Sequence, residues 1–408
     1  MREILLVSIS GEDRPGVTTR VTAVLAQAGV RILDVSQSVI HDRLELGMLV
    51  LVPPSAESAP IVKEVLFAVH ELGMQVHFTP VSEDEYRDWV AEQGQQRHSV
   101  TVLGRGLSAE QISAVTQVVS EQGLNIFAIQ RLSGRVDLDA DDGNGRSCVE
   151  LLVRGRPKDG SAMREELLAF SRKLGVDIAI QADDVYRRTR RLVAFDMDST
   201  LIQAEVIDEL AKAHGVGDQV ADITEQAMRG EIDFAESFRA RVALLEGLDA
   251  SVLAEIAERL PLTEGAERLC RILRHLGYRL AIISGGFTFF GGYLKRRLGI
   301  DHVVANELEI VDGRCTGRHQ GEIIDAQAKA RHLQRICELE GIRLEQTIAV
   351  GDGANDLPML SCAGLGIAFH AKPVVRTRAQ HAISTLGLDA ILYMIGLRDW
   401  QLEANDLA

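Results

Sequence analysis

The chain has 408 residues, of which 46% are hydrophobic, so it is long enough for two or three domains with sizeable cores. Its formal net charge of −15 gives a surface that on average repels nucleic acid and anionic membranes. A small anionic substrate would therefore need a locally positive site, made by Lys, Arg, a metal or helix N-termini.

The first 182 residues show one α+β pattern twice, in the order β-α-β-β-α-β of a ferredoxin-like unit. In the first copy we expect strands at 2–10, 31–41, 44–52 and 75–80, and helices at 17–28 and 60–72. In the second copy we expect strands at 98–103, 124–132, 147–153 and 176–181, and helices at 108–122 and 160–174. Two copies indicate a duplicated domain and not a solenoid. The polar segment 82–97 is expected to link them.

From residue 192 the pattern changes to apolar strands that alternate with helices, which predicts an α/β fold with a Rossmann-like, doubly wound parallel sheet. The expected strands are 192–196, 279–284 and 347–352, and the expected helices are 264–276, 287–298 and 326–340. Residues 203–260 are helical and interrupt this alternation after the first strand, as an inserted helical cap would. Asp312-Gly313 is a hairpin-turn signal.

Each of the three expected strands ends in a residue that could carry chemistry. Asp196, Ser284 and Asp352 are the first polar residues after apolar runs, and such folds place ligands at the carboxyl ends of their strands. In the segment DMDST, Asp196 could attack phosphorus, while Asp198 could protonate the departing oxygen and then deprotonate a water. A strand-end aspartate can equally cap a turn, so this pair alone leaves both interpretations open.

Two further segments could contact phosphate. The hydroxyl of Ser284 and the backbone N–H groups of Gly285 and Gly286 could hold phosphate oxygens, although Ser-Gly-Gly is also an ordinary turn. Lys329 lies in a helix-like segment, where a lone lysine is usually solvated.

The most specific block reads GDGANDLPML and contains Asp352 and Asp356. Two carboxylates among glycines beyond a buried strand suit a hard cation with oxygen ligands. Mg²⁺ would offset the repulsion between these carboxylates and phosphate oxygens.

These four motifs, in this order, resemble the haloacid dehalogenase superfamily of phosphotransferases over residues 192–395. The resemblance implies that Asp196 is the nucleophile and Asp198 the general acid and base. It also implies that Ser284 and Lys329 bind the transferring phosphoryl group and neutralise its charge.

The same resemblance implies a metal site. Asp352 would ligate Mg²⁺ together with Asp196 and the backbone carbonyl of Asp198, and Asp356 would support the site. Dehalogenase members lack the second aspartate, so Asp198 points to phosphoryl transfer and not to cleavage of a carbon–halogen bond.

Segments around the expected cap resemble the phosphoserine phosphatase family more closely. In that family a cap glutamate receives the substrate ammonium group and a cap arginine its carboxylate, and the matching positions are Glu205 and Arg241. Met228 and Phe234 match apolar residues that close over the substrate, and Asn355 matches a substrate-contacting position. The resemblance implies hydrolysis of O-phospho-L-serine through an aspartyl-phosphate intermediate, the last step of L-serine biosynthesis.

Two alternatives stay open at this point. The substrate could be another small phosphate monoester, such as phosphothreonine or phosphohomoserine. The chain could also be an amino-acid-responsive regulator with an inactive phosphatase domain, although every catalytic position is occupied.

The segment SGEDRPGVTTRVTAVLAQAGV resembles the start of an ACT domain, an amino-acid-sensing module. It implies an amino-acid site at the turn formed by Asp13, Arg14, Pro15 and Gly16. Because this sensor-like segment is fused to an expected serine-producing enzyme, our hypothesis is that L-serine, the product, is the effector. The second copy, at 103–111, lacks the Asp-x-Pro-Gly pattern. ACT domains usually pair across chains, so we expect a homodimer, and both copies could serve only for dimerisation.

We expect two ACT-like domains at 1–82 and 97–182, followed by a phosphatase domain at 190–400 with its cap at about 203–262. A cytoplasmic location is expected, because the chain has neither a long apolar run nor a signal-like start. Scattered cysteines without a C-x-x-C pair argue against a disulfide framework and a zinc site. They are Cys148, Cys270, Cys315, Cys337 and Cys362.

Overall fold

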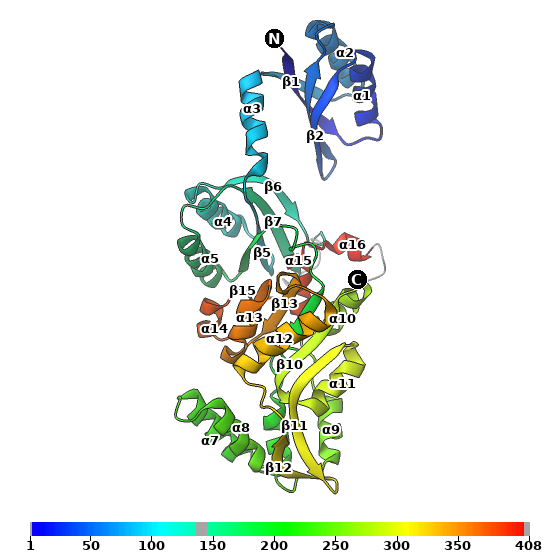
Figure 1. Ribbon diagram of the computed structural model, residues 1–408. Helices are drawn as coiled ribbons and strands as arrows, with labels where there is room; N and C mark the ends of the chain where they lie inside the picture. The colour runs from blue at the N-terminus through cyan, green and yellow to red at the C-terminus, as the bar shows by residue number, and fades with distance from the viewer. Residues whose placement is uncertain (1, 136–144, 404–408) are drawn as a thin grey trace. The chain divides into compact units, whose positions relative to one another are not determined.

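The computed structural model describes residues 2–135 and 145–403 and confirms the predicted fold class (Figure 1). Two copies of a βαββαβ fold precede a doubly wound sheet that carries a helical insertion. The chain divides into two compact units, Met1–Gln95 and Gln96–Ala408.

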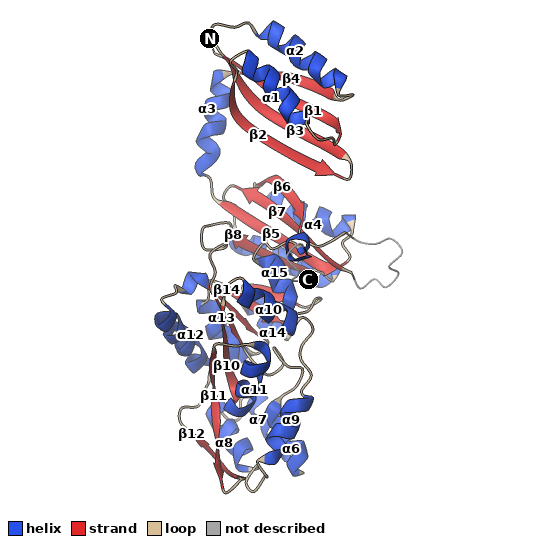
Figure 2. Cartoon of the chain, turned by 90° about the vertical axis from the view of Figure 1, so that its right-hand side faces the viewer, coloured by secondary structure: helices blue, strands red, loops and turns tan. Residues whose placement is uncertain are grey.

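The first unit is an antiparallel sheet in the order β2-β3-β1-β4, with helices α1 and α2 on one face (Figure 2). Alternating residues of β1 and β3, such as Val7 and Met48, point to that face and are fully buried there. The predicted linker contains helix α3, which begins at a capping box formed by Ser82 and Glu85. The elements are β1 Glu3–Glu12, α1 Val17–Gln27, β2 Arg31–Ile40, β3 Arg43–Val52, α2 Ser58–Glu71, β4 Gln75–Val81 and α3 Glu83–Ala91.

The second unit begins with the other βαββαβ copy, whose sheet has the order β6-β7-β5-β8. This copy is joined to the rest of its unit by polar contacts. The carboxylate of Asp177 accepts hydrogen bonds from the backbone N–H groups of Ser384 and Thr385, at 2.7 and 2.9 Å. Its elements are β5 Arg97–Arg105, α4 Ala109–Glu121, β6 Asn125–Arg131, β7 Arg146–Arg154, α5 Gly160–Leu174 and β8 Asp177–Ala182.

A seven-stranded sheet forms the centre of the second unit, in the order β12-β11-β10-β9-β13-β14-β15. All neighbouring pairs are parallel except β11 and β12, which form the hairpin that Asp312-Gly313 predicts. Both turn residues have positive φ, 49° and 76°. The strands are β9 Leu192–Phe195, β10 Arg279–Phe287, β11 His302–Val311, β12 Arg314–Gln320, β13 Thr347–Gly351, β14 Leu365–Phe369 and β15 His381–Ile383.

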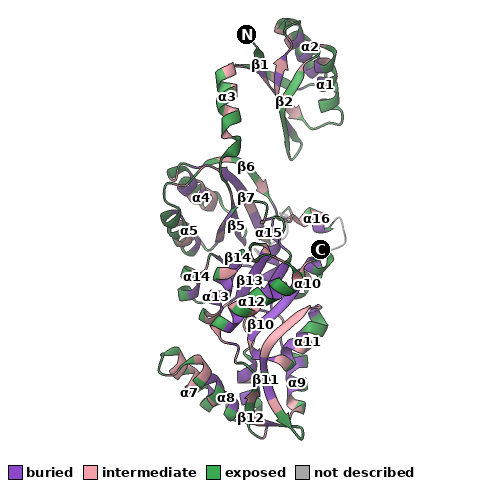
Figure 3. Cartoon of the chain, in the orientation of Figure 1, coloured by how far each residue is buried: buried purple, intermediate pink, exposed green. Residues whose placement is uncertain are grey.

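The three central strands β9, β10 and β13 are almost entirely buried, because helices cover both faces of the sheet (Figure 3). The covering helices are α10 Ala266–His275, α11 Thr288–Leu298, α12 Ala326–Glu340, α13 Leu357–Cys362 and α14 Pro373–Arg378. After the last strand come α15 Ile391–Met394 and α16 Asp399–Glu403, and Asp399 N donates to Leu132 O of the second βαββαβ copy.

The helical insertion follows β9 and forms a cap. Two chain segments connect it to the sheet and are hydrogen-bonded to each other, from Gln203 N to Pro261 O at 2.9 Å and from Thr263 N to Leu201 O at 3.0 Å. The cap also contacts the β11–β12 hairpin, where Gly247 N donates to Cys315 O at 2.8 Å. Its helices are α6 Val206–His214, α7 Gly217–Met228, α8 Phe234–Ala243 and α9 Ser251–Arg259.

Candidate active site

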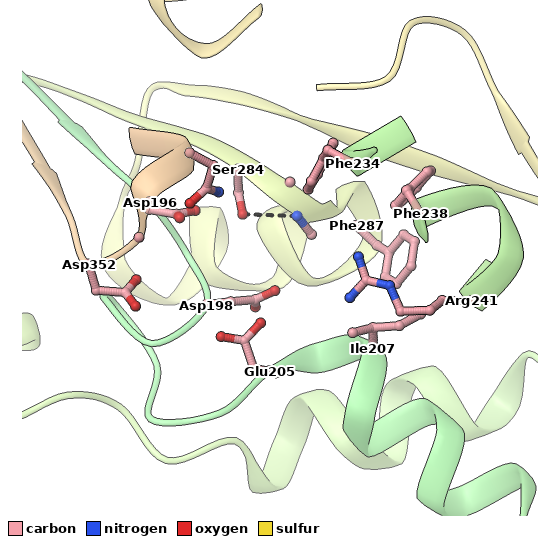
Figure 4. A pocket seen from close by; sticks show the side chains of 14 residues that line it. Asp196, Asp198, Glu205, Ile207, Phe234, Phe238, Arg241, Ser284, Phe287 and Asp352 are labelled. Atoms are coloured by element: carbon pink, nitrogen blue, oxygen red, sulfur yellow. Dashed lines mark hydrogen bonds between the residues drawn. The ribbon is translucent and has the colours of Figure 1, made fainter. Parts of the chain in front are cut away.

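The three predicted strand-end residues meet at one edge of the sheet. Strand β9 pairs in parallel with β10 on one side and β13 on the other, so Asp196, Ser284 and Asp352 come together (Figure 4). They open onto a cavity of about 200 Å³ between the sheet and the cap. The lining residues are Asp196, Asp198, Glu205, Ile207, Phe234, Phe238, Arg241, Ser284, Gly285, Gly286, Phe287, Asp352, Gly353 and Asn355.

Asp196 is held by two hydrogen bonds. Its Oδ1 accepts from the backbone N–H of Met197 at 2.7 Å, and its Oδ2 accepts from Nζ of Lys329 at 2.7 Å. Lys329 is fully buried in the first turn of α12. Burial opposes its charged form, but the carboxylates of Asp196 and Asp356 outweigh burial and raise the pKa of Lys329. The lysine is therefore a fixed positive charge beside the predicted nucleophile.

Asp356 positions this lysine. Its Oδ1 accepts from Lys329 Nζ at 2.6 Å, and its Oδ2 accepts from the backbone N–H of Gly353 at 2.9 Å. Burial and the nearby carboxylate of Asp196 raise the pKa of Asp356, against the opposing effect of Lys329. Each carboxylate oxygen of Asp356 thus already accepts one hydrogen bond, and the side chain links Lys329 to the loop after β13.

The donor set fits a hard divalent cation. One carboxylate oxygen each from Asp196, Asp352 and Asp356 lie within 4.8 Å of one another. Burial, followed by the charges of Asp196 and Glu205, raises the pKa of Asp352 to about 6. Its Oδ1 also accepts a hydrogen bond from Thr200 Oγ1 at 3.2 Å. Such clustered carboxylates repel one another, and a cation between them would remove that repulsion.

Asp198 has the properties of a general acid. It is half-buried, and desolvation together with the charges of Glu205 and Asp196 raises its pKa well above the usual range for a carboxyl group. Its Oδ1 has no hydrogen-bond partner among the described residues. The close-up view places its carboxyl group between Asp196 and Glu205, facing the cavity (Figure 4). A protonated carboxyl here could donate to a leaving group.

The predicted phosphate-binding residues form a bulge in β10. Pairing with β11 is regular up to Ile283 and resumes at Phe287, so the residues between them leave the ladder. Within the bulge, the N–H of Gly286 donates to Ser284 Oγ at 3.0 Å. A Cβ atom on Gly286 would lie 2.4 Å from the terminal methyl group of Met197 and 2.9 Å from Asp198 Oδ2, so a larger residue would displace both side chains.

Glu205 and Arg241 also line the cavity, and Glu205 lies beside Asp198 (Figure 4). Glu205 precedes helix α6 and accepts a hydrogen bond from Ser199 Oγ at 2.7 Å. Arg241, on α8, donates a hydrogen bond from Nε to the carbonyl of Ser237 at 3.4 Å and has no salt bridge among the described residues. Desolvation lowers the pKa of Arg241 and raises that of Glu205. Two groups of opposite charge, an exposed Glu205 and a half-buried Arg241, thus line the cavity without an ion pair between them among the described residues.

The apolar wall differs from the prediction at one position. Phe234 lines the cavity, but Met228 does not, and it is 67% exposed. Met228 is the last residue of α7, a helix in which only Val220 is buried. Sequence reasoning missed Phe238, whose ring stacks on Phe234 at 6.4 Å. The i, i+4 spacing of these two phenylalanines, which places them on one helix face, was the available signal.

The turn predicted as an amino-acid site lies between β1 and α1. Asp13 N donates to Asp42 O at 2.7 Å, and Gly16 has a φ of 94° before the helix begins. Arg14 pairs with Glu12 at 2.5 Å. A separate cavity of about 480 Å³ lies on the sheet face beside α3, and the turn residues are not part of its lining.

Three segments match known family models. Residues 193–361 match the haloacid dehalogenase-like hydrolase family, and residues 3–79 and 96–181 each match an ACT domain. A phosphoserine phosphatase of Streptomyces coelicolor is 44% identical over 402 residues, which cover 98% of this chain and 94% of that protein. The chain belongs to the phosphoserine phosphatase family. Phosphoserine phosphatase SerB2 of Mycobacterium tuberculosis is 42% identical over 403 residues, 98% of this chain and 95% of that protein.

Solved structures of phosphoserine phosphatases and related hydrolases have the same fold. A probable phosphoserine phosphatase of Vibrio cholerae aligns with a TM-score of 0.57 and 35% identity, over 76% of this chain and 89% of that one. A HAD-family hydrolase of Salmonella enterica serovar Typhi aligns with a TM-score of 0.63 and 31% identity, over 73% of this chain and 98% of that one.

Among the described residues of the present chain, no helix is both long and apolar enough to cross a membrane.

Proposed function

We propose that the chain hydrolyses O-phospho-L-serine to L-serine and phosphate. The observation that carries this proposal is the cavity with two chemically distinct ends. One end offers Asp196 and Ser284 to a phosphoryl group, with the buried ammonium group of Lys329 bonded to Asp196. Beyond Asp198, the cavity offers Glu205 to an ammonium group and Arg241 to a carboxylate, and no ion pair joins these two side chains among the described residues. The full-length relatives with this family name support the assignment.

In the first half-reaction, an oxygen of Asp196 forms a bond to phosphorus while the bond from phosphorus to the seryl oxygen breaks. Asp198 gives its proton to that oxygen, so neutral serine leaves. Lys329 and the bulge at Ser284 hold the equatorial phosphoryl oxygens and stabilise their charge.

In the second half-reaction, a water attacks phosphorus and gives its proton to the carboxylate that Asp198 has become. The bond between phosphorus and Asp196 breaks, and phosphate leaves. Asp196, Asp352 and the backbone carbonyl of Asp198 would hold Mg²⁺, which would supply positive charge against the repulsion between carboxylate and phosphoryl oxygens. The first two belong to the carboxylate cluster at the strand ends. Asn355 lines the cavity and is positioned to contact the substrate.

Regulation and assembly belong to the same proposal. L-serine, as the product, acts as an effector at the ACT domains, and the chain forms a homodimer through them. The five cysteines are all unpaired, which supports a reducing, cytoplasmic compartment.

A substrate panel tests the assignment. Phosphate release is measured with Mg²⁺ for O-phospho-L-serine, phosphothreonine, phosphohomoserine and phenyl phosphate. We expect the highest kcat/KM for O-phospho-L-serine. A higher kcat/KM for another ester would identify that ester as the substrate instead. Inactivity on all four esters would favour a regulator with an inactive phosphatase domain.

A further inference from the structure

Asn306 occupies a position between two segments that bind phosphate in the proposed function. It lies on β11, its side chain is 1% exposed, and it does not line the cavity. Its residue pair in β10 is Phe287, the first residue after the bulge. In β10, three residues, Ser284 to Gly286, lie between paired positions, whereas β11 has only one between Val304 and Asn306.

The bulge leaves backbone groups without strand partners, and the side chain of Asn306 replaces one of those partners. Its Nδ2 donates a hydrogen bond of 2.7 Å to the carbonyl oxygen of Gly285. Because this carbonyl belongs to the middle residue of the bulge, the bond fixes the segment that carries Ser284 and the N–H of Gly286.

The same amide reaches a second segment. Oδ1 of Asn306 accepts a hydrogen bond of 2.9 Å from the backbone N–H of Ile324. Ile324 is followed by Asp325, which caps α12 through a 2.7 Å bond from Ala328 N. The next residue of that helix is Lys329, whose ammonium group contacts Asp196. The position of Ile324 therefore sets where α12 begins and where its lysine points.

We propose that Asn306 is a positioning residue for phosphoryl transfer, which clamps the phosphate-binding bulge at Gly285 to the start of the helix that carries Lys329. The inference rests on the proposed function and deepens it. The clamp acts at the phosphate end of the cavity and leaves the contacts of Glu205 and Arg241 unchanged, because neither residue touches either clamped segment through a hydrogen bond.

The chain offers a matched control in Thr347. Its side chain is also fully buried, donates to one backbone carbonyl, of Leu344 at 2.7 Å, and accepts from one backbone N–H, of Gly364 at 3.4 Å. Thr347 lies at the start of β13, whereas the site lies beyond its end at Gly351. Asn306→Leu and Thr347→Val thus each replace a buried side chain that makes two hydrogen bonds by an apolar one of similar shape. The first substitution lies beside the site and the second away from it.

The test uses the full chain with Mg²⁺ and measures kcat and KM on O-phospho-L-serine and on phenyl phosphate, the inhibition constant of orthovanadate, and the melting temperature. We expect Asn306→Leu to lower kcat at least tenfold on both esters and to raise the orthovanadate constant at least fivefold. We expect Thr347→Val to change kcat and the orthovanadate constant by less than twofold, although its melting temperature falls by about as much as that of Asn306→Leu. If Asn306→Leu does not fold, Asn306→Ser, which leaves room for a water, takes its place in the same comparison.

Values of kcat and of the orthovanadate constant within twofold of those of Thr347→Val would overturn the inference and leave Asn306 a purely structural residue. Failure of the proposed function gives a different result. A wild-type protein inactive on both esters refutes the proposed function and this inference with it. A wild type active only on phenyl phosphate refutes O-phospho-L-serine as the substrate, but the two variants can still be compared on phenyl phosphate.

Discussion

Lys329 Nζ lies 2.7 Å from Asp196 Oδ2, and neither side chain is more than 7% exposed. The nucleophile proposed here is thus paired with a buried cation before any substrate binds. We predict that Lys329→Met lowers kcat by about 10²–10³-fold, as removal of a preorganised charge-stabilising donor does. We also predict that it lowers the free energy of unfolding by about 3–5 kcal/mol, because it leaves the carboxylates of Asp196 and Asp356 without their buried partner.

Phosphate release and chemical unfolding measure these two effects of Lys329→Met. Arg335→Met, an exposed substitution on the same helix, is the matched control and should leave both values near those of the wild type. Wild-type kcat in Lys329→Met would show that the lysine is only a structural counter-ion.

The raised pKa of Asp198 predicts a step-specific defect. Asp198→Asn should lower kcat on O-phospho-L-serine by about 10²–10⁴-fold, because the seryl oxygen must leave with a proton. With p-nitrophenyl phosphate, whose leaving group needs no proton, the variant should still transfer the phosphoryl group to Asp196. The aspartyl-phosphate formed there should then be hydrolysed slowly. Rapid-mixing absorbance would then show a burst of about one nitrophenolate per active site. Equal losses on both esters, without a burst, would argue against Asp198 as the acid.

The pKa of Asp352, about 6, predicts how metal affinity depends on pH. Below this value the carboxyl group is protonated and must lose its proton to bind Mg²⁺. The apparent affinity should therefore be about tenfold weaker at pH 5 than above pH 7. Titration calorimetry with Mg²⁺ measures it, and equal affinities at the two pH values would contradict the proposed role of Asp352 as a ligand.

The same group affects stability without the metal. Its pKa in the folded chain lies above the ordinary value of 3.8, so protonation stabilises the fold at low pH, and this contribution is lost as the pH rises through about 6. Mg²⁺ should consequently raise the melting temperature more at pH 7 than at pH 5. A larger rise at pH 5 would contradict this assignment.

Arg241 should determine recognition of the substrate carboxylate. Arg241→Ala is expected to raise KM for O-phospho-L-serine by about 10–100-fold and to leave KM for phenyl phosphate within about twofold, because only the first ester presents a carboxylate to the guanidinium group. Arg239→Ala, an exposed substitution on the same helix, is the control and should change neither value. Equal effects of Arg241→Ala on both esters would place the carboxylate elsewhere.

Much of the site could be predicted from the sequence, because chemistry at strand ends leaves a local signal. Asp196, Ser284 and Asp352 each follow an uninterrupted apolar run, and parallel pairing brings such ends together. The turn at Asp312-Gly313 could also be predicted from the sequence, since adjacent positions with positive φ favour these residue types.

Other features depend on tertiary contacts that no local pattern encodes. Strand β15 has only three residues, too few for a periodic signal, and exists because it pairs with β14. Asn306 reads as an ordinary polar residue in a strand, and its two partners are distant in sequence. The exposed position of Met228 follows from how α7 packs in the cap, which its sequence match to a closing residue did not indicate.

The most direct test of the central claim is phosphate release from O-phospho-L-serine with Mg²⁺, compared between the wild type and Asp196→Asn. The account predicts rapid release by the wild type, which a chelator abolishes, and no measurable release by Asp196→Asn, since an amide cannot form the aspartyl-phosphate. Asp196→Asn retaining more than about one tenth of wild-type kcat would contradict the account, because phosphoryl transfer would then not pass through this carboxylate.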